Sequence, residues 1–224
     1  MDIGRAFGYI FDDERWGSKV LAGGLLNLVP VLNLATLGYT LRTLRNVAAG
    51  EARPLPAWDN LGDDLAKSLV AFAAYALYAL PLVFILAVST IFSAVAGRLG
   101  AHEGLRGILW LCGTVLSCLV ATYALLLAAW LPAATVRYAQ AGALAAFFQF
   151  KEVWAFIARD PAGYVVALFA SWLAALVALV VGSVFCFVGI AFTALVAGLV
   201  WAHLMGELAY QAQKGSNWAV PDSF

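Results

Sequence analysis

The chain has 224 residues with 13 basic and 13 acidic side chains, so its formal net charge is zero. Hydrophobic residues make up 64% and charged residues 12% of the sequence, and the mean hydropathy is +0.89. Soluble domains contain about 45–50% apolar and about 25% charged residues, so this composition excludes an ordinary soluble protein. The sequence has no basic stripe, and we expect no nucleic-acid partner.

Charged residues are missing from four long apolar runs. The runs contain 22 residues between Lys19 and Arg42, 30 between Lys67 and Arg98, 30 between Arg106 and Arg137, and 46 between Asp160 and Glu207. A helix of about 20 apolar residues crosses a bilayer core of roughly 30 Å. The expected fold is therefore all-α: a polytopic helical membrane protein in which residues 1–224 form a single membrane domain.

Residues 1–16 are expected to contain an amphipathic helix. Its apolar face consists of positions spaced as i, i+3, i+4, i+7 and i+8, namely Ile3, Ala6, Phe7, Ile10 and Phe11. Such a helix can lie in the headgroup region of a bilayer or dock on the rest of the protein. The acidic residues that follow do not fit a cleavable signal peptide, so we expect this end to stay in the mature protein.

Residues 18–44 form a broken first segment, because Pro30 lies near its middle and removes a backbone donor. It is either a kinked span or a re-entrant pair of half-helices. Asn27, Pro30, Asn33 and Tyr39 are the candidate polar site at this break. At membrane depth, the N–H and C=O groups of irregular backbone need hydrogen-bond partners from protein or from a water-filled cavity. We therefore expect later spans to cover the tip at residues 30–33.

Four full spans are expected at residues 65–96, 107–137, 163–182 and 187–209. The last charge-free run must hold two spans, because a single helix of 46 residues would be roughly 69 Å long. Gly182-Ser183 is the natural break, and it predicts a tight apolar hairpin. A second amphipathic stretch is expected near residues 147–157, where Phe150, Val153 and Trp154 share one helix face.

A weak internal repeat relates two of these regions. Residues 45–50, Arg-Asn-Val-Ala-Ala-Gly, are similar to residues 137–142, Arg-Tyr-Ala-Gln-Ala-Gly. Each follows an apolar segment and precedes an aromatic stretch and an acidic residue. Both an ancient duplication and shared interface chemistry explain this pattern.

Residues 16–60 carry a more specific resemblance. The pattern is a Gly-rich apolar segment with a proline, then Gly38-Tyr39, Arg42, Gly50 and Leu55-Pro56-Ala57-Trp58-Asp59. It resembles the uncharacterised prokaryotic membrane proteins of the domain-of-unknown-function family 4013. The resemblance implies a prokaryotic integral membrane protein, and it implies no activity.

The sidedness of the chain follows from its Lys and Arg residues, which concentrate in short cytoplasmic loops. If residues 18–44 return to their starting side, 11 basic residues lie on one side and two on the other; if they cross once, the division is 8 to 5. We expect the returning arrangement, in a multi-pass protein of the inner cell membrane with both termini cytoplasmic. The expected interfacial anchors are Trp16, Arg45, Trp58, Arg137 and Trp154.

The sequence offers little catalytic chemistry. His203 and Glu207 lie one turn apart on a helix, but a pair supplies only two metal ligands, and we expect an ordinary interfacial hydrogen bond. No catalytic motif is present, so we expect no enzyme activity, cofactor or metal.

Two classes of function remain. The first is a non-catalytic accessory or scaffolding subunit that packs against lipid and against other membrane proteins or itself. The second is a transporter or channel for a small or lipid-like solute.

Overall fold

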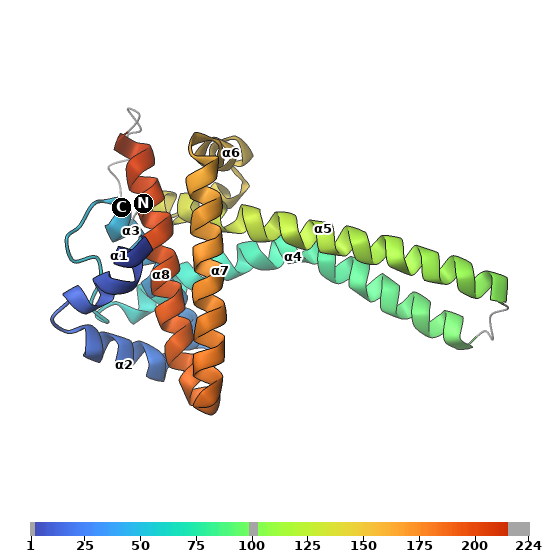
Figure 1. Ribbon diagram of the computed structural model, residues 1–224, viewed down its shortest axis with the longest axis horizontal. Coiled ribbons are helices and arrows are strands. Elements are labelled where there is room, and N and C mark those ends of the chain that lie inside the picture. Colours follow the sequence, from blue (N-terminus) through green and yellow to red (C-terminus); the bar gives the residue numbers. More distant parts are fainter. Residues whose placement is uncertain (1–2, 99–102, 215–224) are drawn as a thin grey trace. The chain divides into compact units, whose positions relative to one another are not determined.

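A computed structural model describes residues 3–98 and 103–214. Every regular element in this part of the chain is helical, and four helices are long and apolar enough to cross a membrane (Figure 1). The predicted all-α polytopic fold is therefore confirmed. The chain divides into two compact units: unit 1 is Met1–Ala71 with Pro132–Phe224, and unit 2 is Phe72–Leu131. The single membrane domain stays a prediction.

Unit 1 is built on an antiparallel hairpin of α7 (Pro161–Val184) and α8 (Cys186–Lys214). Asp160 begins α7, because its side chain accepts a 2.8 Å hydrogen bond from Gly163 N and Pro161 occupies the first turn. Phe185 alone separates the two helices. The predicted break and tight apolar hairpin are thus present, three residues beyond Gly182.

The first apolar segment forms two helices, α2 (Trp16–Asn27) and α3 (Asn33–Ala48). At 1.5 Å per residue they are about 18 and 24 Å long, each shorter than a bilayer core of roughly 30 Å. Pro30 lies in the turn between them, and the next residue, Val31, has a φ of 74°. A β-branched residue in the left-handed region is rare, so this turn is strained.

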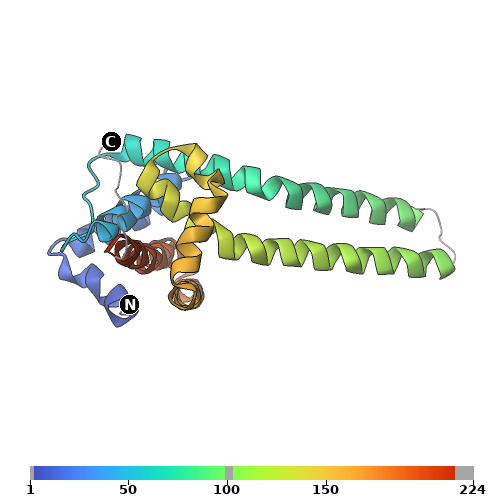
Figure 2. The same ribbon diagram turned by 90° about the horizontal axis from the view of Figure 1, so that it is seen from above.

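The α2–α3 pair turns back near the start of α8. Asn27 Nδ2 donates to Ala191 O at 2.8 Å, near the start of α8, whereas Gly206, near the other end, packs against Leu44 and Val47 of α3. The chain therefore runs along α8 toward the α7–α8 turn as α2 and back again as α3. Figure 2, which views α7 and α8 nearly end-on, shows α8 between α7 and the N-terminal helices.

The tip of this helical hairpin differs from the prediction. Residues 30–33 are all exposed, so the expectation that later spans cover them is wrong for this chain by itself. The reason is that contact with α8 ends at Asn27 and Gly24, and the turn extends past it. The side chain of Asn27 does have protein partners, because its Oδ1 also accepts from Thr36 Oγ1 at 2.8 Å.

The N-terminal segment is α1 (Ile3–Gly8) followed by the 3₁₀ helix η1 (Tyr9–Asp12). Of the expected apolar face, Ala6 and Ile10 are buried, but Phe7 and Phe11 are 45% and 62% exposed. The change of helix type rotates the buried face, and Tyr9 is buried instead. The hydroxyl of Tyr9 donates to Leu199 O at 2.9 Å, so this segment docks beside the middle of α8.

The longest helices are α4 (Leu61–Arg98) and α5 (Glu103–Ala141), which extend beyond the predicted spans at both ends. The 3₁₀ helix η2 (Leu144–Phe148) and α6 (Phe150–Arg159) connect α5 to α7. The two glycines of the internal repeat have the same conformation: Gly50 and Gly142 both adopt positive φ, at 78° and 69°, just after α3 and α5. The repeat therefore marks two similar helix ends.

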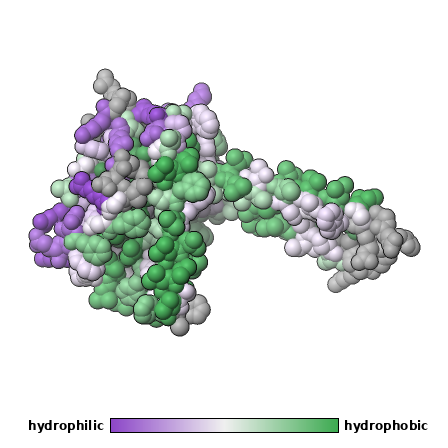
Figure 3. Space-filling view, in the orientation of Figure 1, coloured by the Kyte–Doolittle hydropathy of each residue, from purple (hydrophilic) through white to green (hydrophobic). Residues whose placement is uncertain are grey.

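The surface of unit 1 is divided by polarity. Hydrophilic residues gather near the end that carries α6, and hydrophobic residues surround the α7–α8 turn (Figure 3). Exposed aromatic side chains accompany the polar end, including Phe150 and Trp154 on α6.

Candidate functional site

The segment at residues 54–59 contains the Leu-Pro-Ala-Trp-Asp motif and is held by side chains from several other parts of unit 1. It forms no regular structure, yet four successive carbonyls each accept a hydrogen bond from a different side chain. Pro54 O accepts from Asn46 Nδ2 at 2.9 Å, Leu55 O from Lys19 Nζ at 2.7 Å, Pro56 O from Tyr39 Oη at 2.9 Å, and Ala57 O from Arg42 Nη2 at 2.9 Å.

The two prolines explain why side chains take this role. Pro54 and Pro56 have no N–H, and each biases the preceding residue toward an extended conformation. The segment therefore cannot pair its carbonyls within a helix of its own. Backbone polar groups in a packed setting require partners, and residues of α2 and α3 supply them. The motif fastens the connection between α3 and α4 to the α2–α3 helical hairpin.

Tyr39 and Trp58 form the apolar half of this arrangement. Their rings stack with centroids 4.0 Å apart and an interplanar angle of 12°. Trp58 Nε1 donates to Lys19 O at 2.9 Å. Tyr39 is buried with Ile10, Leu195 and neighbouring residues in the core of unit 1. A stacked aromatic pair with both polar atoms satisfied contributes about 0.5–1.5 kcal/mol beyond its buried area.

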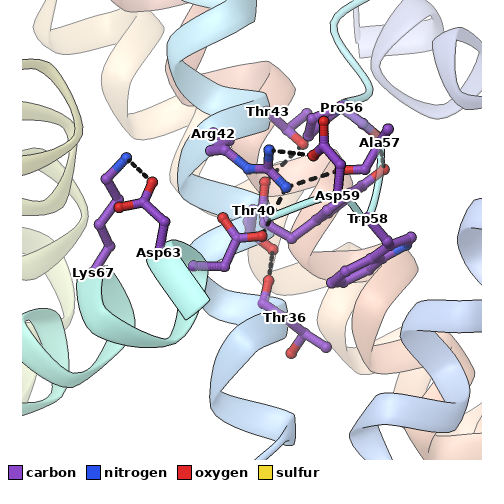
Figure 4. A network of polar contacts seen from close by, with 12 residues as sticks. Thr36, Thr40, Arg42, Thr43, Pro56, Ala57, Trp58, Asp59, Asp63 and Lys67 are labelled. Carbon is purple, nitrogen blue, oxygen red and sulfur yellow. Dashed lines mark hydrogen bonds and ion pairs between the residues drawn. The ribbon is translucent and has the colours of Figure 1, made fainter. Parts of the chain in front are cut away.

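Arg42 is the centre of the polar half (Figure 4). Its Nη2 lies 2.7 Å from Asp64 Oδ2, and its Nη1 lies 3.2 Å from Asp59 Oδ1. The Asp64 side chain has no solvent exposure, while that of Asp59 is 71% exposed. Arg42 also holds down the pKa of the Asp59 carboxyl through this hydrogen bond. We call Lys19, Tyr39, Arg42, Trp58, Asp59 and Asp64 the Arg42 network.

Two atoms of the buried ion pair lack a hydrogen-bond partner in the described part of the chain, Arg42 Nε and Asp64 Oδ1. The hydrogen-bonding capacity of the Arg42–Asp64 pair is therefore not fully used. The pair contributes to stability mainly because neither charge is left buried without the other. Any change that removes one partner alone leaves the other charge buried.

Gly38 lets α4 approach the network. A Cβ at this position would collide with the backbone carbonyl of Asp64. The absence of a side chain therefore brings the first turn of α4 into contact with α3, which places the Asp64 carboxylate against Arg42. Asp63, on the same turn, instead pairs with Lys67 at 2.7 Å.

Lys19 links the network to the N-terminal segment. Its Nζ lies 2.7 Å from Asp13 Oδ2, and Arg15 N donates to Asp13 Oδ1 at 2.8 Å. Burial by itself raises the pKa of Asp13, but the hydrogen bonds from Lys19 and Arg15 outweigh it and hold the pKa below its ordinary value. Asp13 is therefore ionised at neutral pH and fixes the position of the Lys19 ammonium group.

The structure separates the four residues of the predicted broken-helix site. Asn27 bonds to α8 and to Thr36, Pro30 and Asn33 lie exposed in the α2–α3 turn, and Tyr39 belongs to the Arg42 network. These side chains do not converge on one cavity.

The five expected anchors fall into two groups. Trp16, Arg45 and Trp154 are exposed. Trp58 is packed in the Arg42 network, and the Arg137 side chain is 13% exposed, with Nη2 donating to Gln149 Oε1 at 3.1 Å. Arg137 thus ties the end of α5 to the start of α6. The interfacial role of all five remains a prediction.

His203 lies inside unit 1, where it stacks on Tyr9 with ring centroids 4.4 Å apart. Glu207 follows one turn later and accepts from Gln211 Nε2 at 3.2 Å. In the described residues, no group of three or more His, Cys, Asp or Glu side chains lies close enough to hold a metal ion. Cys112 and Cys118 are both exposed free thiols on α5.

The pairing of Arg42 with Asp64 was not predicted from the sequence. The two residues are 22 positions apart, and no spacing rule relates them. The signal was the motif itself, since Tyr, Arg and Trp-Asp residues that resemble one family pattern all meet in one network. Lys19 and Asp13 had no comparable signal.

Comparison with known proteins agrees with the family resemblance of residues 16–60. No curated protein and no solved structure matches the chain. The family described as protein of unknown function (DUF4013) matches residues 22–188, which include the second half of α2, all of α3 and the whole 54–59 segment. The chain therefore belongs to the DUF4013 family.

Proposed function

We propose that this protein is a non-catalytic integral membrane protein, an accessory or scaffolding subunit that packs against partner membrane proteins and lipid. The observation that carries the proposal is the use of the family motif. Tyr39, Arg42 and Trp58 all bond within the chain. Residues bound in this way hold helices together, which supports a structural role for the motif.

Unit 2 supplies the surface for a partner. A cavity of about 720 Å³ lies along α4 and α5, and small residues line it, among them Ser89, Ser93, Gly113, Ser117 and Ala121. Spacings of four residues in Ser89–Ser93 and Gly113–Ser117–Ala121 put small side chains on one face of each helix. Small residues allow close approach between transmembrane helices, so the proposed occupant is a transmembrane helix of another membrane protein.

The proposed location is the inner cell membrane with both termini cytoplasmic. The return of α2 and α3 toward one end of α8 supports the arrangement in which 11 of 13 basic residues share a side. Single cysteines at Glu51 and Gln149, in a background without native cysteines, test it with an impermeant thiol reagent on intact cells. We expect both to be protected until the cells are opened.

A transport function has less support than a role as an accessory subunit. Asn27 is a partly buried amide of the broken segment, and its two polar atoms are bonded to Ala191 O and Thr36 Oγ1. Protein, rather than a water-filled cavity, thus satisfies this group. A transporter is therefore kept as the alternative outcome of the test below.

The test is extraction from the native membrane without detergent, followed by sizing. An accessory subunit is expected to migrate with a complex much larger than 23.8 kDa. Ser117→Leu replaces a small lining residue with a bulky one, which obstructs close helix approach and should release the chain from that complex. Thr122→Leu is the matched control, because Thr122 is exposed on the same helix, does not line the cavity and bonds back to its own helix as Ser117 does. Migration of the wild type alone or as a homo-oligomer would favour the transporter.

A further inference from the structure

A small basic cavity lies in unit 1 where α3, α4 and the end of α5 meet. Its volume is about 80 Å³, and its lining includes Arg42, Arg45 and Lys67 together with Tyr138 and Gly142. A cavity of roughly 10–15 Å³ on the same measure holds one water molecule, so this one has room for a phosphate-sized group. None of its lining residues is acidic.

The three cations differ in how much of their charge is already used. Arg45 has no ion pair and no side-chain hydrogen bond among the described residues. Lys67 pairs with Asp63 one turn away, but both side chains are partly exposed, at 34% and 43%, and such pairs are weak. Arg42 is bound to Asp64 and Asp59, yet its Nε–H has no acceptor there. Donor capacity is therefore left on all three side chains.

The walls of the cavity are fixed by bonds between elements. Tyr138 Oη donates to Lys67 O at 2.8 Å, which joins α5 to the second turn of α4. The Tyr138 ring stacks on Phe147 of η2 with centroids 4.9 Å apart. Gly142 turns the chain away from α5 with positive φ. The cations are thus held in place around a preformed space rather than spread along a flexible loop.

We propose that this cavity binds an anionic phosphate group. A phosphate oxygen accepts charge-assisted hydrogen bonds from guanidinium and ammonium donors, and basic pockets between membrane helices bind the headgroups of anionic lipids. The phosphate belongs either to the headgroup of an anionic phospholipid or to a free phosphate. Arg45 is the principal ligand and Lys67 is the second.

The lipid arm uses the full-length protein, delipidated in mild detergent and titrated with phosphatidylglycerol or phosphatidylcholine while bound lipid is counted by native mass spectrometry. Arg45→Gln should weaken phosphatidylglycerol binding about fivefold, and Lys67→Gln should weaken it by a similar factor, since one basic residue near an anionic surface contributes about 1 kcal/mol. Phosphatidylcholine, whose phosphate is balanced by choline, should respond little.

Arg53→Gln is the matched control. Arg53 lies in the same connection between α3 and α4, pairs with Glu14 at the surface and does not line the cavity. It removes the same charge, so it should leave phosphatidylglycerol binding within twofold of the wild type. Arg45→Lys keeps the charge and should restore part of the binding.

The phosphate arm measures thermal unfolding with inorganic phosphate against chloride at equal ionic strength. An Arg45-dependent rise in the unfolding midpoint identifies free phosphate as a ligand, whereas no rise, together with Arg45-dependent phosphatidylglycerol binding, identifies the lipid headgroup. If Arg45→Gln and Arg53→Gln behave alike in both arms, the site does not exist. Exposed Arg45 is not part of the core, so its variants should remain folded.

Discussion

The two units differ in how much long-range polar bonding holds them together. In unit 1 tyrosine hydroxyls and asparagine amides bond across elements far apart in the sequence, as Tyr9 does with Leu199 and Tyr138 with Lys67, while its Ser and Thr hydroxyls, such as those of Thr43 and Ser171, bond to their own helices. In unit 2 most described hydroxyls bond to a carbonyl one turn earlier on their own helix, as Ser89 does with Ile85 and Thr114 with Trp110. Contacts across that unit include Tyr123 with Tyr78 and Trp130 with Tyr78.

This difference separates two ways of stabilising helices in a membrane. Cross-element polar contacts and buried side chains determine how unit 1 packs, because each broken contact leaves a buried group unsatisfied. Unit 2 exposes long apolar faces, with Trp110 75% exposed. Most of its described hydroxyl groups form hydrogen bonds within their own helix. It therefore depends on lipid or on a partner helix. Matched substitutions in the two units should test the contrast.

The largest effect is expected for Arg42→Met. It removes the cation and leaves the Asp64 carboxylate buried without its partner, which costs about 3–5 kcal/mol. The measurement is the free energy of unfolding in mixed detergent micelles. Arg53→Met removes an exposed cation paired with Glu14 and should cost less than about 1 kcal/mol.

The double variant Arg42→Met with Asp64→Asn sharpens this prediction. Removing both charges avoids the isolated carboxylate, so the pair of changes should cost less than Arg42→Met alone. A double variant that is the sum of the two single effects would show that the two charges are not coupled. The Arg42 network would then owe its stability to the carbonyl contacts.

The second effect compares Gly38→Ala with Gly113→Ala. A methyl at Gly38 meets the backbone of Asp64 and forces α3 and α4 apart, which should cost about 1–3 kcal/mol. Nothing lies within 4 Å of the corresponding position at Gly113 in unit 2. Alanine there should be neutral or stabilise the helix by roughly 0.5–1 kcal/mol. Equal losses at both glycines would contradict the contrast, as measured by thermal unfolding in the same detergent.

Much of the fold could be predicted from the sequence, because a helix that crosses the hydrocarbon core must be long and apolar. Long charge-free runs predict spanning helices, and α4, α5, α7 and α8 all lie where the runs are. Pro30 and the lengths of the flanking helices account for the break in the first segment. The return of α3 was favoured only by the distribution of Lys and Arg, since the direction of a short helix depends on what it packs against.

The Arg42 network was less accessible, for a physical reason. Pairing between Arg42 and Asp64 requires the first turn of α4 to reach α3, and Gly38 permits that approach only through tertiary packing. The carbonyls at residues 54–57 carry no side-chain signal at all. The prediction that later spans cover residues 30–33 was wrong. The need of the backbone for hydrogen-bond partners does not determine which groups supply them.

The third effect concerns single hydroxyls. Tyr39→Phe keeps the stack on Trp58 but leaves Pro56 O without its donor, which should cost about 0.5–1.5 kcal/mol. Tyr123→Phe in unit 2 removes a similar bond to Tyr78 O, at 2.8 Å. That carbonyl is part of a continuous helix and retains its helical partner, so the loss should be smaller. Thermal unfolding of the two variants side by side decides whether the difference exists.

The smallest effect is the dependence of stability on pH through Asp13. Hydrogen bonds from Lys19 and Arg15 hold the pKa of Asp13 below its ordinary value of 3.8 in the folded protein. A carboxyl group whose pKa is lower in the folded state than in the unfolded state stabilises the folded protein. The stabilisation is complete when the pH is above the unfolded-state pKa, and it is lost as the pH falls through the folded-state pKa. Asp13→Asn lacks the contribution at every pH. The stability difference between wild type and Asp13→Asn should therefore be constant from pH 7 to about pH 5 and shrink below about pH 4. The matched control for loss of a carboxylate in this segment is Asp12→Asn, which changes a neighbouring residue outside the Lys19 contact. A difference that stays constant down to pH 3 would mean that Asp13 does not hold Lys19 as a charged pair, and that the N-terminal segment is secured by Tyr9 and Ile10 instead.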